Sequence, residues 1–524
     1  MRLMWVLRLL LVVMPCGSAA LAVEADVIEP AEVGQLSVAD RGTPIPSVSE
    51  DVPPLQVNLT EALRLAFTEG RSKKTSDEDL TLVAHRLRVV RRDYGPRLSG
   101  TIDGDLSADE AESPDAEIGA SVTVSQELPT AGRVSVTGST RRLEPADGDG
   151  SYNQNLEVVL TQPLLRDAGQ LVWREGLTDA ERAYLYAERG HVQFLQDLSL
   201  DVADSFWRLQ VQQYRVESSR DDVKRNEFGL DQAKAFLGLG RTTANDVFRA
   251  EVSLLQAQQS LVDAIAAYDA SLDRFKIDLN LPVDAPVDIT GDAPQRPLLD
   301  VDSRLAIQIA LDNRLDLMTS KDRIGDAQRN VALARNNILP DLDLDARASW
   351  GENTQRPWDD VIDDRPDYIV GLTLEIPFER YRERFGYAER MTDLSQARRS
   401  SDLKESQVVR EVQAALRDLR IAEVSLKIQE RNIEQSRKRL IKSQMDFEDG
   451  LISNRDLVEA QGEVRDAEVA FFQARINYTA AELRLRRETG VLVVDAAGMW
   501  RTTLPSYIKV RDGEQGAMGD DGAK

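Results

Sequence analysis

The sequence has little of what catalytic and metal-binding sites are built from. Its 524 residues include one cysteine, Cys16, and two histidines, His85 and His191, which stand far apart. A disulfide needs two cysteines and a zinc site needs three or four ligands, so the sequence predicts neither. It also contains no Gly-rich phosphate loop after a strand and no Gly-x-Ser-x-Gly nucleophile motif. We therefore expect no enzymatic activity, no metal and no cofactor, and solvated helix positions for both histidines.

Long apolar runs are missing as well. The apolar stretch Leu9–Met14 is too short to span a bilayer, which needs about 20 residues. Since it follows a positively charged start and precedes the small-residue site Ala20–Ala22, we assign residues 1–22 to a secretory signal peptide. Cys16 falls inside this signal, where a lipid anchor is the open alternative to cleavage. Any membrane passage by the mature chain would then use strands closed into a barrel.

Basic residues are fewer than acidic ones, 65 against 89. The formal net charge is −24 at pH 7. Affinity for nucleic acid comes from neutralising phosphates with Lys and Arg, so a chain this acidic repels DNA and RNA. Nucleic acid is therefore excluded from the expected partners.

What the sequence does contain is an internal repeat. Pro96 recurs 244 residues later as Pro340, whereas Pro163 recurs only 214 residues later as Pro377. The first copy therefore holds 30 more residues than the second between its two prolines. We divide the chain into residues 1–22 (signal peptide), 23–54 (flexible N-terminal extension), 55–285 (first structural repeat), 286–300 (linker), 301–495 (second structural repeat) and 496–524 (C-terminal tail).

Each copy repeats a hydrophobic residue every seven positions, which is typical of left-handed helix-on-helix packing. In the first copy the run is Val202, Leu209, Val216, Val223, Leu230 and Leu237. In the second it is Val412, Leu419, Leu426, Ile433, Leu440 and Phe447. Both runs end at a glycine turn and are followed by a return run, so each copy is expected to hold a long antiparallel helical hairpin. Val216 and Leu426 should then face neighbouring helices.

Between its prolines each copy shows the other period. Leu98, Gly100, Ile102 and Gly104 alternate with polar residues after Pro96. We expect strands at about residues 97–162 in the first copy and 341–376 in the second. Alternation of this kind is typical of membrane-barrel strands, although a half-buried surface sheet shows it too.

An additional pair of alternating segments lies at about residues 118–141, in the stretch that carries the 30-residue excess. Its apolar positions are Ala120, Val122, Val124, Val134 and Val136. Either this pair is a soluble hairpin or each chain contributes six strands to a barrel, and the alternation fits both.

With these landmarks the chain resembles the TolC-like outer membrane efflux proteins over about residues 55–495. The motifs that carry the resemblance are Leu59–Leu63, Leu160–Leu165, Leu339–Leu342, Gly240–Val247 and Gly450–Leu457. The resemblance implies an α+β fold, mostly α, in which three copies form an α-helical barrel across the periplasm and a shared β-barrel in the outer membrane. It also implies a homotrimer, a periplasmic adaptor (membrane fusion) protein, an inner-membrane pump and surrounding outer-membrane lipid.

Acidic residues just past the two glycine turns are the sharpest site candidates. The resemblance places Asp456 and Glu459 where acidic rings constrict the periplasmic entrance, and Asp246 is the weaker counterpart in the first copy. Threefold symmetry would gather three copies of each carboxylate near one axis, as in cation pores. The alternative is helix capping, since acids in a first turn favour the positive end of a helix.

Exposed tip residues are the candidates for contact with the adaptor. They are Gly240, Arg241, Thr242, Gly450, Ser453 and Asn454. Their Ser, Thr and Asn members are also ordinary N-cap candidates.

The expected function is a passive outer-membrane exit duct of a tripartite efflux or type I secretion system. The alternative is a non-pore trimeric coiled-coil structural protein of the cell envelope. The sequence leaves both the cargo and the class of pump open.

Overall fold

The computed structural model describes residues 55–107, 115–144, 151–239, 243–291, 298–354, 365–448, 451–452, 454–500 and 508–510. All of them belong to the unit Pro54–Lys524. The helices are α2 (Leu59–Thr68), α3 (Arg71–Asp93), α4 (Gln170–Gly238), α5 (Ala244–Asp278), α6 (Ser303–Asn313), α7 (Leu315–Asn336), α8 (Tyr381–Glu448) and α9 (Asn454–Glu488). The strands are β1 (Leu55–Val57), β2 (Arg97–Ser107), β3 (Asp115–Glu127), β4 (Arg133–Glu144), β5 (Ser151–Pro163), β6 (Val287–Ile289), β7 (Leu299–Val301), β8 (Asp341–Thr354), β9 (Asp367–Glu375) and β10 (Ile508–Val510).

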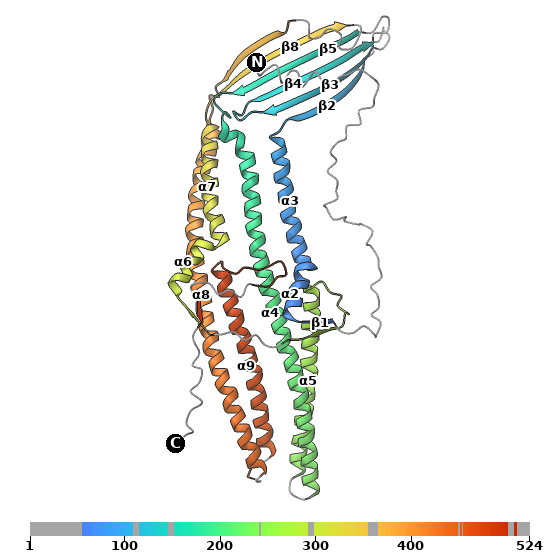
Figure 1. The fold of residues 1–524 in the computed structure, drawn as a ribbon, viewed down its shortest axis with the longest axis vertical. Helices are drawn as coiled ribbons and strands as arrows, with labels where there is room; N and C mark the ends of the chain where they lie inside the picture. The colour runs from blue at the N-terminus through green and yellow to red at the C-terminus, as the bar shows by residue number, and fades with distance from the viewer. Residues whose placement is uncertain are drawn as a thin grey trace, which may run out of the picture. The chain divides into compact units, whose positions relative to one another are not determined.

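Two long helical hairpins dominate the fold (Figure 1). Helix α4 has 69 residues and packs along α5, and α8 has 68 residues and packs along α9. At about 1.5 Å per residue, α4 and α8 are each about 100 Å long. The predicted hairpin in each copy is therefore confirmed. Among the described residues, no helix is both long and apolar enough to cross a membrane.

The heptad positions form the contact between the helices. Val202, Leu209 and Val216 on α4 are buried, and so are Val412 and Leu419 on α8. Leu426 is partly buried against the apolar cluster of the second copy, so the prediction that Val216 and Leu426 face helix neighbours is confirmed. Leu237, the last position of the first run, is 40% exposed. The seam is therefore apolar in its middle and open toward the helix tip.

The apolar core has two clusters, each with a short helix packed against a long one, and the first also contains Ile476 and Leu483 of α9. In the first copy Ala62 and Ala66 of α2 are almost fully buried in the cluster that contains Phe206 of α4. Their counterparts Ala306 and Ala310 of α6 are fully buried in the cluster of the second copy. Alanine at these positions lets the backbone of the short helix approach the long one, which explains why the same residue occurs in both copies.

Short strands occur in the segments that were assigned as linker and C-terminal tail. Strand β6 lies within the expected linker 286–300 and pairs in parallel with β1. Strand β7 begins in the same segment and pairs with β10, which belongs to the expected tail 496–524. Trp500, also from that tail, is 6% exposed and lies against Trp207, with ring centroids 6.3 Å apart. Both segments therefore contribute contacts to the cores.

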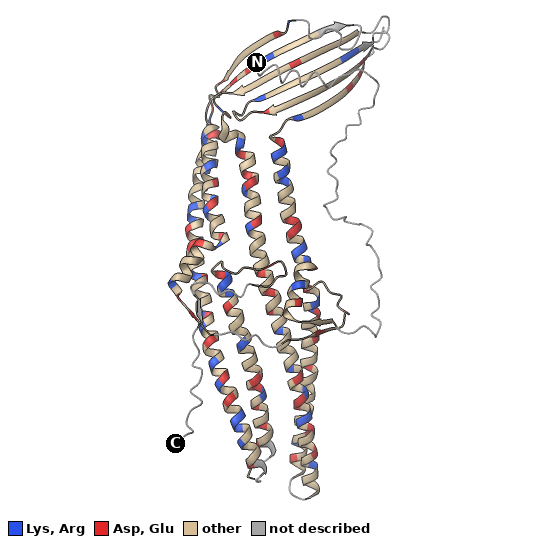
Figure 2. Ribbon diagram, viewed as in Figure 1, with Lys and Arg blue, Asp and Glu red and all other residues tan. Residues whose placement is uncertain are grey.

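A single six-stranded sheet lies at one end of the long helices (Figure 1). Its strand order is β2-β3-β4-β5-β8-β9, and every neighbouring pair is antiparallel. The additional alternating pair of the first copy forms β3 and β4, which lie inside this sheet between β2 and β5. Figure 2 shows that charges of both signs are interspersed along the helices and are sparser on the strands.

Candidate functional site

The six-stranded sheet has one apolar and one polar face. Strand pairing aligns one row of side chains across all six strands, namely Leu98, Val124, Val136, Val158, Ala348 and Tyr368. The adjacent row is Ser99, Thr123, Thr137, Glu157, Ser349 and Asp367. Because side chains alternate between faces along a strand, the two rows lie on opposite sides of the sheet.

The apolar face is open to its surroundings. Leu98 is 73% exposed, Ile102 85% and Val370 71%. A soluble monomer rarely leaves a large contiguous apolar patch uncovered, so such a face indicates contact with lipid or with another protein.

The polar face carries hydroxyl groups and paired charges. Arg141 of β4 forms ion pairs with Glu117 of β3 at 3.1 Å and with Asp103 of β2 at 3.5 Å. Arg347 of β8 pairs with Glu157 of β5 at 3.0 Å. These ion pairs connect strands of both copies on the polar face of the sheet.

Specific contacts tie the sheet to the helices. The Gln126 side chain on β3 donates to the Tyr94 carbonyl at the end of α3, at 2.9 Å. The Tyr94 hydroxyl in turn accepts from the Leu177 N–H of α4 at 3.0 Å, and the Tyr94 ring meets Trp173 edge-on. Arg380, just before α8, donates to the Ile338 carbonyl at 2.8 Å. These contacts hold the end of α3 against the sheet and against α4, and they connect the start of α8 to the segment that follows α7.

At the tip of the first hairpin Asp246 forms a capping box. Its carboxylate accepts from the Thr243 N–H at 3.1 Å and from the Thr243 hydroxyl at 2.6 Å, and the Asp246 N–H donates back to that hydroxyl. Arg249 lies 4.0 Å away. Asp246 therefore caps the start of α5, which is the role that the sequence offered as the alternative. Its part in an entrance stays a prediction.

Asp456 lies in the first turn of α9 and Glu459 in the next, and both are exposed. Residues three apart on a helix share one side, so both acids lie on the same side of α9. Gly240, Arg241, Thr242, Gly450 and Ser453 lie outside the described residues. Asn454 is the first residue of α9.

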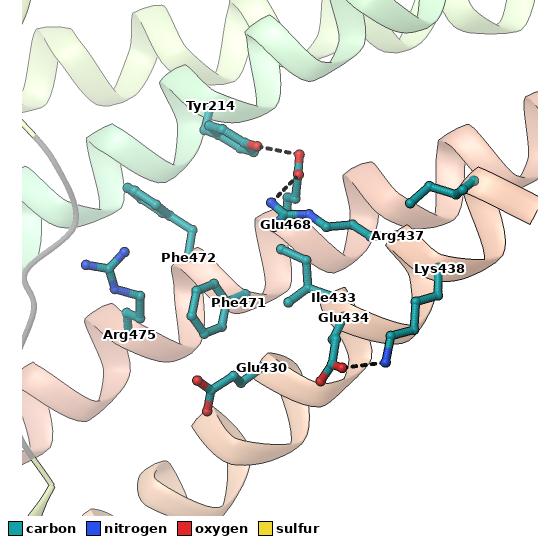
Figure 3. A pocket seen from close by; sticks show the side chains of 11 residues that line it. Tyr214, Glu430, Ile433, Glu434, Arg437, Lys438, Glu468, Phe471, Phe472 and Arg475 are labelled. Atoms are coloured by element: carbon teal, nitrogen blue, oxygen red, sulfur yellow. Dashed lines mark hydrogen bonds and ion pairs between the residues drawn. The ribbon is translucent and has the colours of Figure 1, made fainter. Parts of the chain in front are cut away.

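Further from the tips, a groove of about 670 Å³ opens between α8 and α9, beside Tyr214 of α4 (Figure 3). The Tyr214 hydroxyl donates to Glu468 of α9 at 3.2 Å, and Arg437 of α8 donates to the other carboxylate oxygen at 2.9 Å. The Tyr214 ring stacks on Phe472 with centroids 5.7 Å apart. Glu468 therefore links α4 of the first copy to the hairpin of the second. Sequence reasoning missed this link, because its partners are 254 residues apart.

Tyr214 also gives this link a pH dependence. Burial, with the nearby Glu468 charge, raises the pKa of Tyr214 to about 12. A group whose folded pKa exceeds its unfolded value of about 10 stabilises the fold below pH 10, and that stabilisation is lost as the pH rises toward 12.

Tyr214→Phe should therefore lower the free energy of unfolding by about 1 kcal/mol at neutral pH, the usual net worth of a hydrogen bond. The difference from wild type should shrink between pH 10 and 12 in denaturant titrations. Tyr381→Phe, at an 85% exposed position, is the matched control and should match wild type throughout. A Tyr214→Phe protein as stable as the control would show that this bond contributes nothing.

A second cluster that sequence reasoning missed surrounds Arg314, between α6 and α7. Its guanidinium forms ion pairs with Asp316 and Glu411 at 2.6 Å and with Glu488 at 2.7 Å, while the Arg314 side chain is only 6% exposed. Lys404 of α8 pairs with Asp316 at 2.7 Å. The cluster joins the α6–α7 junction to both long helices of the second copy.

The expectation that both histidines are solvated is wrong for His191. Its side chain is 15% exposed, forms a hydrogen bond with the Ser76 hydroxyl at 2.8 Å and lies 3.5 Å from Asp77. His191 therefore contributes to the contact between α3 and α4. Among the described residues, no group of three or more side chains could hold a metal ion.

The known proteins that this chain resembles are outer membrane efflux and secretion proteins. A sequence profile of the family described as "Outer membrane efflux protein" matches residues 306–491. Outer membrane protein TolC of Vibrio cholerae is 23% identical over 336 residues, 60% of this chain and 73% of the relative. Alkaline protease secretion protein AprF of Pseudomonas aeruginosa is 25% identical over 360 residues, 66% of this chain and 71% of the relative.

Solved structures share the fold. The CmeC outer membrane channel of Campylobacter jejuni superposes with a TM-score of 0.61 and 13% identity, covering 85% of this chain and 87% of that one. The outer membrane protein VceC of Vibrio cholerae gives a TM-score of 0.59 and 14% identity, covering 82% of this chain and 96% of that one. At these identities the likeness concerns the fold alone.

Proposed function

We propose that this chain, a TolC-like member of the outer membrane efflux protein family located in the outer membrane, is the passive exit duct of a tripartite efflux or type I secretion system. The observation that carries the proposal is a sheet with one exposed apolar face and one polar face, continued by helices about 100 Å long. Such a sheet suits lipid on one side and water on the other.

In this proposal three copies close the wall. Among the described residues, β2 and β9 each pair with one strand only, so both edges of the sheet are free to bond. An unpaired edge in a bilayer leaves backbone groups unsatisfied, and barrels remove that cost by closing. Pairing β2 of one copy with β9 of the next would close a β-barrel, and the hairpins α4–α5 and α8–α9 would form the α-helical barrel below it.

The duct itself would need no cofactor and no catalysis. A periplasmic adaptor would engage the hairpin tips, and an inner-membrane pump would supply the energy and select the cargo. The non-pore coiled-coil alternative offers no reason for a sheet whose exposed apolar and polar faces run unbroken through all six strands.

The entrance test is to neutralise the two acids of α9 together. With Asp456→Asn and Glu459→Gln, the preference of reconstituted channels for cations over anions should fall several-fold, because six carboxylates would leave the axis of the trimer. Block by a trivalent cation should disappear. The wild-type preference should also weaken with salt, since the screening length falls from about 30 Å at 0.01 M to about 3 Å at 1 M.

Glu434→Gln is the matched control. Glu434 is an exposed acid of the other helix of this hairpin, α8, and pairs with Lys438 at 2.6 Å, so its neutralisation should leave selectivity and block near wild type. If the double variant kept the wild-type selectivity and block in planar bilayers, Asp456 and Glu459 would be helix-end acids and the constriction would lie elsewhere.

A further inference from the structure

The hairpin β3–β4 explains the unequal length of the two copies. The first copy exceeds the second by 30 residues between the prolines Pro96 and Pro163. Strands β3 and β4, with the turn between them, run from Asp115 to Glu144 and so span 30 residues. One insertion of this hairpin therefore accounts for the whole difference.

Without the hairpin the two copies would be alike. Strand β2 starts after Pro96 as β8 starts after Pro340, and β5 ends at Pro163 as β9 ends before Pro377. Since β2, β3, β4 and β5 alternate in direction, β2 and β5 are antiparallel to each other, as β8 and β9 are. Two added strands therefore leave both flanking helices at the same end of the sheet (Figure 1).

The hairpin is also in phase with its neighbours. Val124 of β3 and Val136 of β4 continue the apolar row from Leu98 to Val158, and Thr123 and Thr137 continue the polar row beside it. A slip of one residue would place every side chain of the hairpin on the other face. A hairpin that covered the sheet or stood in solvent would not need to keep this register.

Apolar side chains of the hairpin are exposed, as those on the rest of the apolar face are. Ile118 is 59% exposed and Val122 is 48% exposed, both on β3. On the polar face Arg141 of β4 forms an ion pair with Asp103 of β2. This ion pair joins the hairpin to a strand outside it.

We infer that β3–β4 is an insertion into the membrane wall that widens the pore, raising the size limit for polar cargo at the outer membrane. The inference rests on the proposed trimeric duct. Six strands per chain give eighteen in a trimer, against twelve without the hairpin. Barrel diameter grows roughly linearly with strand number, so the added strands widen the barrel by about 1.5-fold, into the range of strand numbers that leaves an aqueous channel.

Site-specific labelling tests whether the hairpin is in the wall. An environment-sensitive fluorophore is attached to Val122→Cys or Ser121→Cys in reconstituted trimers, and to Val158→Cys or Glu157→Cys on β5 as the matched pair outside the hairpin. A lipid-phase nitroxide should quench the Val122 and Val158 labels several-fold more than the Ser121 and Glu157 labels. Aqueous iodide should show the reverse order.

The two possible failures are distinguishable. If iodide quenched both hairpin labels while the Val158 label stayed lipid-quenched, the hairpin would lie outside the wall and this inference would be overturned. If the Val158 label also lacked lipid quenching, the proposed membrane duct itself would be wrong.

Deleting residues 115–144 tests the width. This variant restores the spacing of the second copy, so the trimer should still insert. The largest polyethylene glycol that enters the pore from the outer side should have a diameter smaller by about one third. An unchanged size limit would contradict the widening. If the variant failed to assemble, the labelling experiment with the full chain would decide alone.

Discussion

Arg314→Met is expected to lower the free energy of unfolding by about 3 kcal/mol, because it removes a buried positive charge that neutralises three partly buried carboxylates. Asp316, Glu411 and Glu488 all lie within 2.7 Å of the guanidinium. Without Arg314, Asp316 keeps its ion pair with Lys404 at 2.7 Å and Glu488 keeps its ion pair with Arg487 at 2.9 Å. Methionine fills similar volume, so the loss reports the uncompensated charges more than a cavity.

The same cluster predicts a pH dependence in the wild-type protein. Burial alone would raise the pKa of Asp316, but hydrogen bonds from Arg314 and Lys404 outweigh it and hold that pKa well below its usual range. A carboxyl with a depressed folded pKa contributes stability above its unfolded pKa of about 3.9, and loses it as the pH falls below that value. The gap between wild type and Arg314→Met should therefore narrow below about pH 4.

The control for Arg314 is an exposed arginine with a single partner. Arg208 on α4 is 74% exposed and pairs with Asp204 one turn earlier. Exposed pairs contribute about 0–1 kcal/mol, so Arg208→Met should leave the denaturation midpoint almost unchanged. Equal losses in the two variants would show that the Arg314 cluster is no stronger than a surface pair.

Leu419→Asp is expected to cost at least about 3 kcal/mol. Leu419 is a heptad residue of α8, 5% exposed, in the apolar cluster that includes Tyr478 and Leu485 of α9. The substitution removes buried methyl groups and places a carboxylate inside an apolar cluster. The loss should appear as a lower thermal midpoint and a lower denaturant midpoint of the protein.

Two further variants separate the effect of burying a carboxylate from the effect of changing the side chain at position 419. Gln413→Asp adds the same carboxylate at an exposed position of α8, and it should be nearly neutral. Leu419→Met keeps the volume, so it should cost less than about 1.5 kcal/mol. A Leu419→Asp protein as stable as Gln413→Asp would show that the α8–α9 seam faces solvent.

The long helical hairpins and the duplication could be predicted from the sequence, because both leave periodic signals. A residue that recurs every seven positions from Val202 or Val412 must line one side of a helix, whatever that helix packs against. Strand alternation likewise predicts β3 and β4, although it does not predict where they pair. The fully buried alanines Ala62 and Ala306 follow the same repeat.

The parts that the sequence left open all depend on which distant residues meet. Alternation around Val122 fits a soluble hairpin and a wall strand equally, and only pairing with β2 and β5 decided for the shared sheet. The Tyr214–Glu468 link and the Arg314 cluster join residues with no common local pattern, so no window of sequence contains them. Local periodicity determined the elements of this protein, whereas strand register and long-range charge pairing, which exist only after the chain is packed, decided how they are joined.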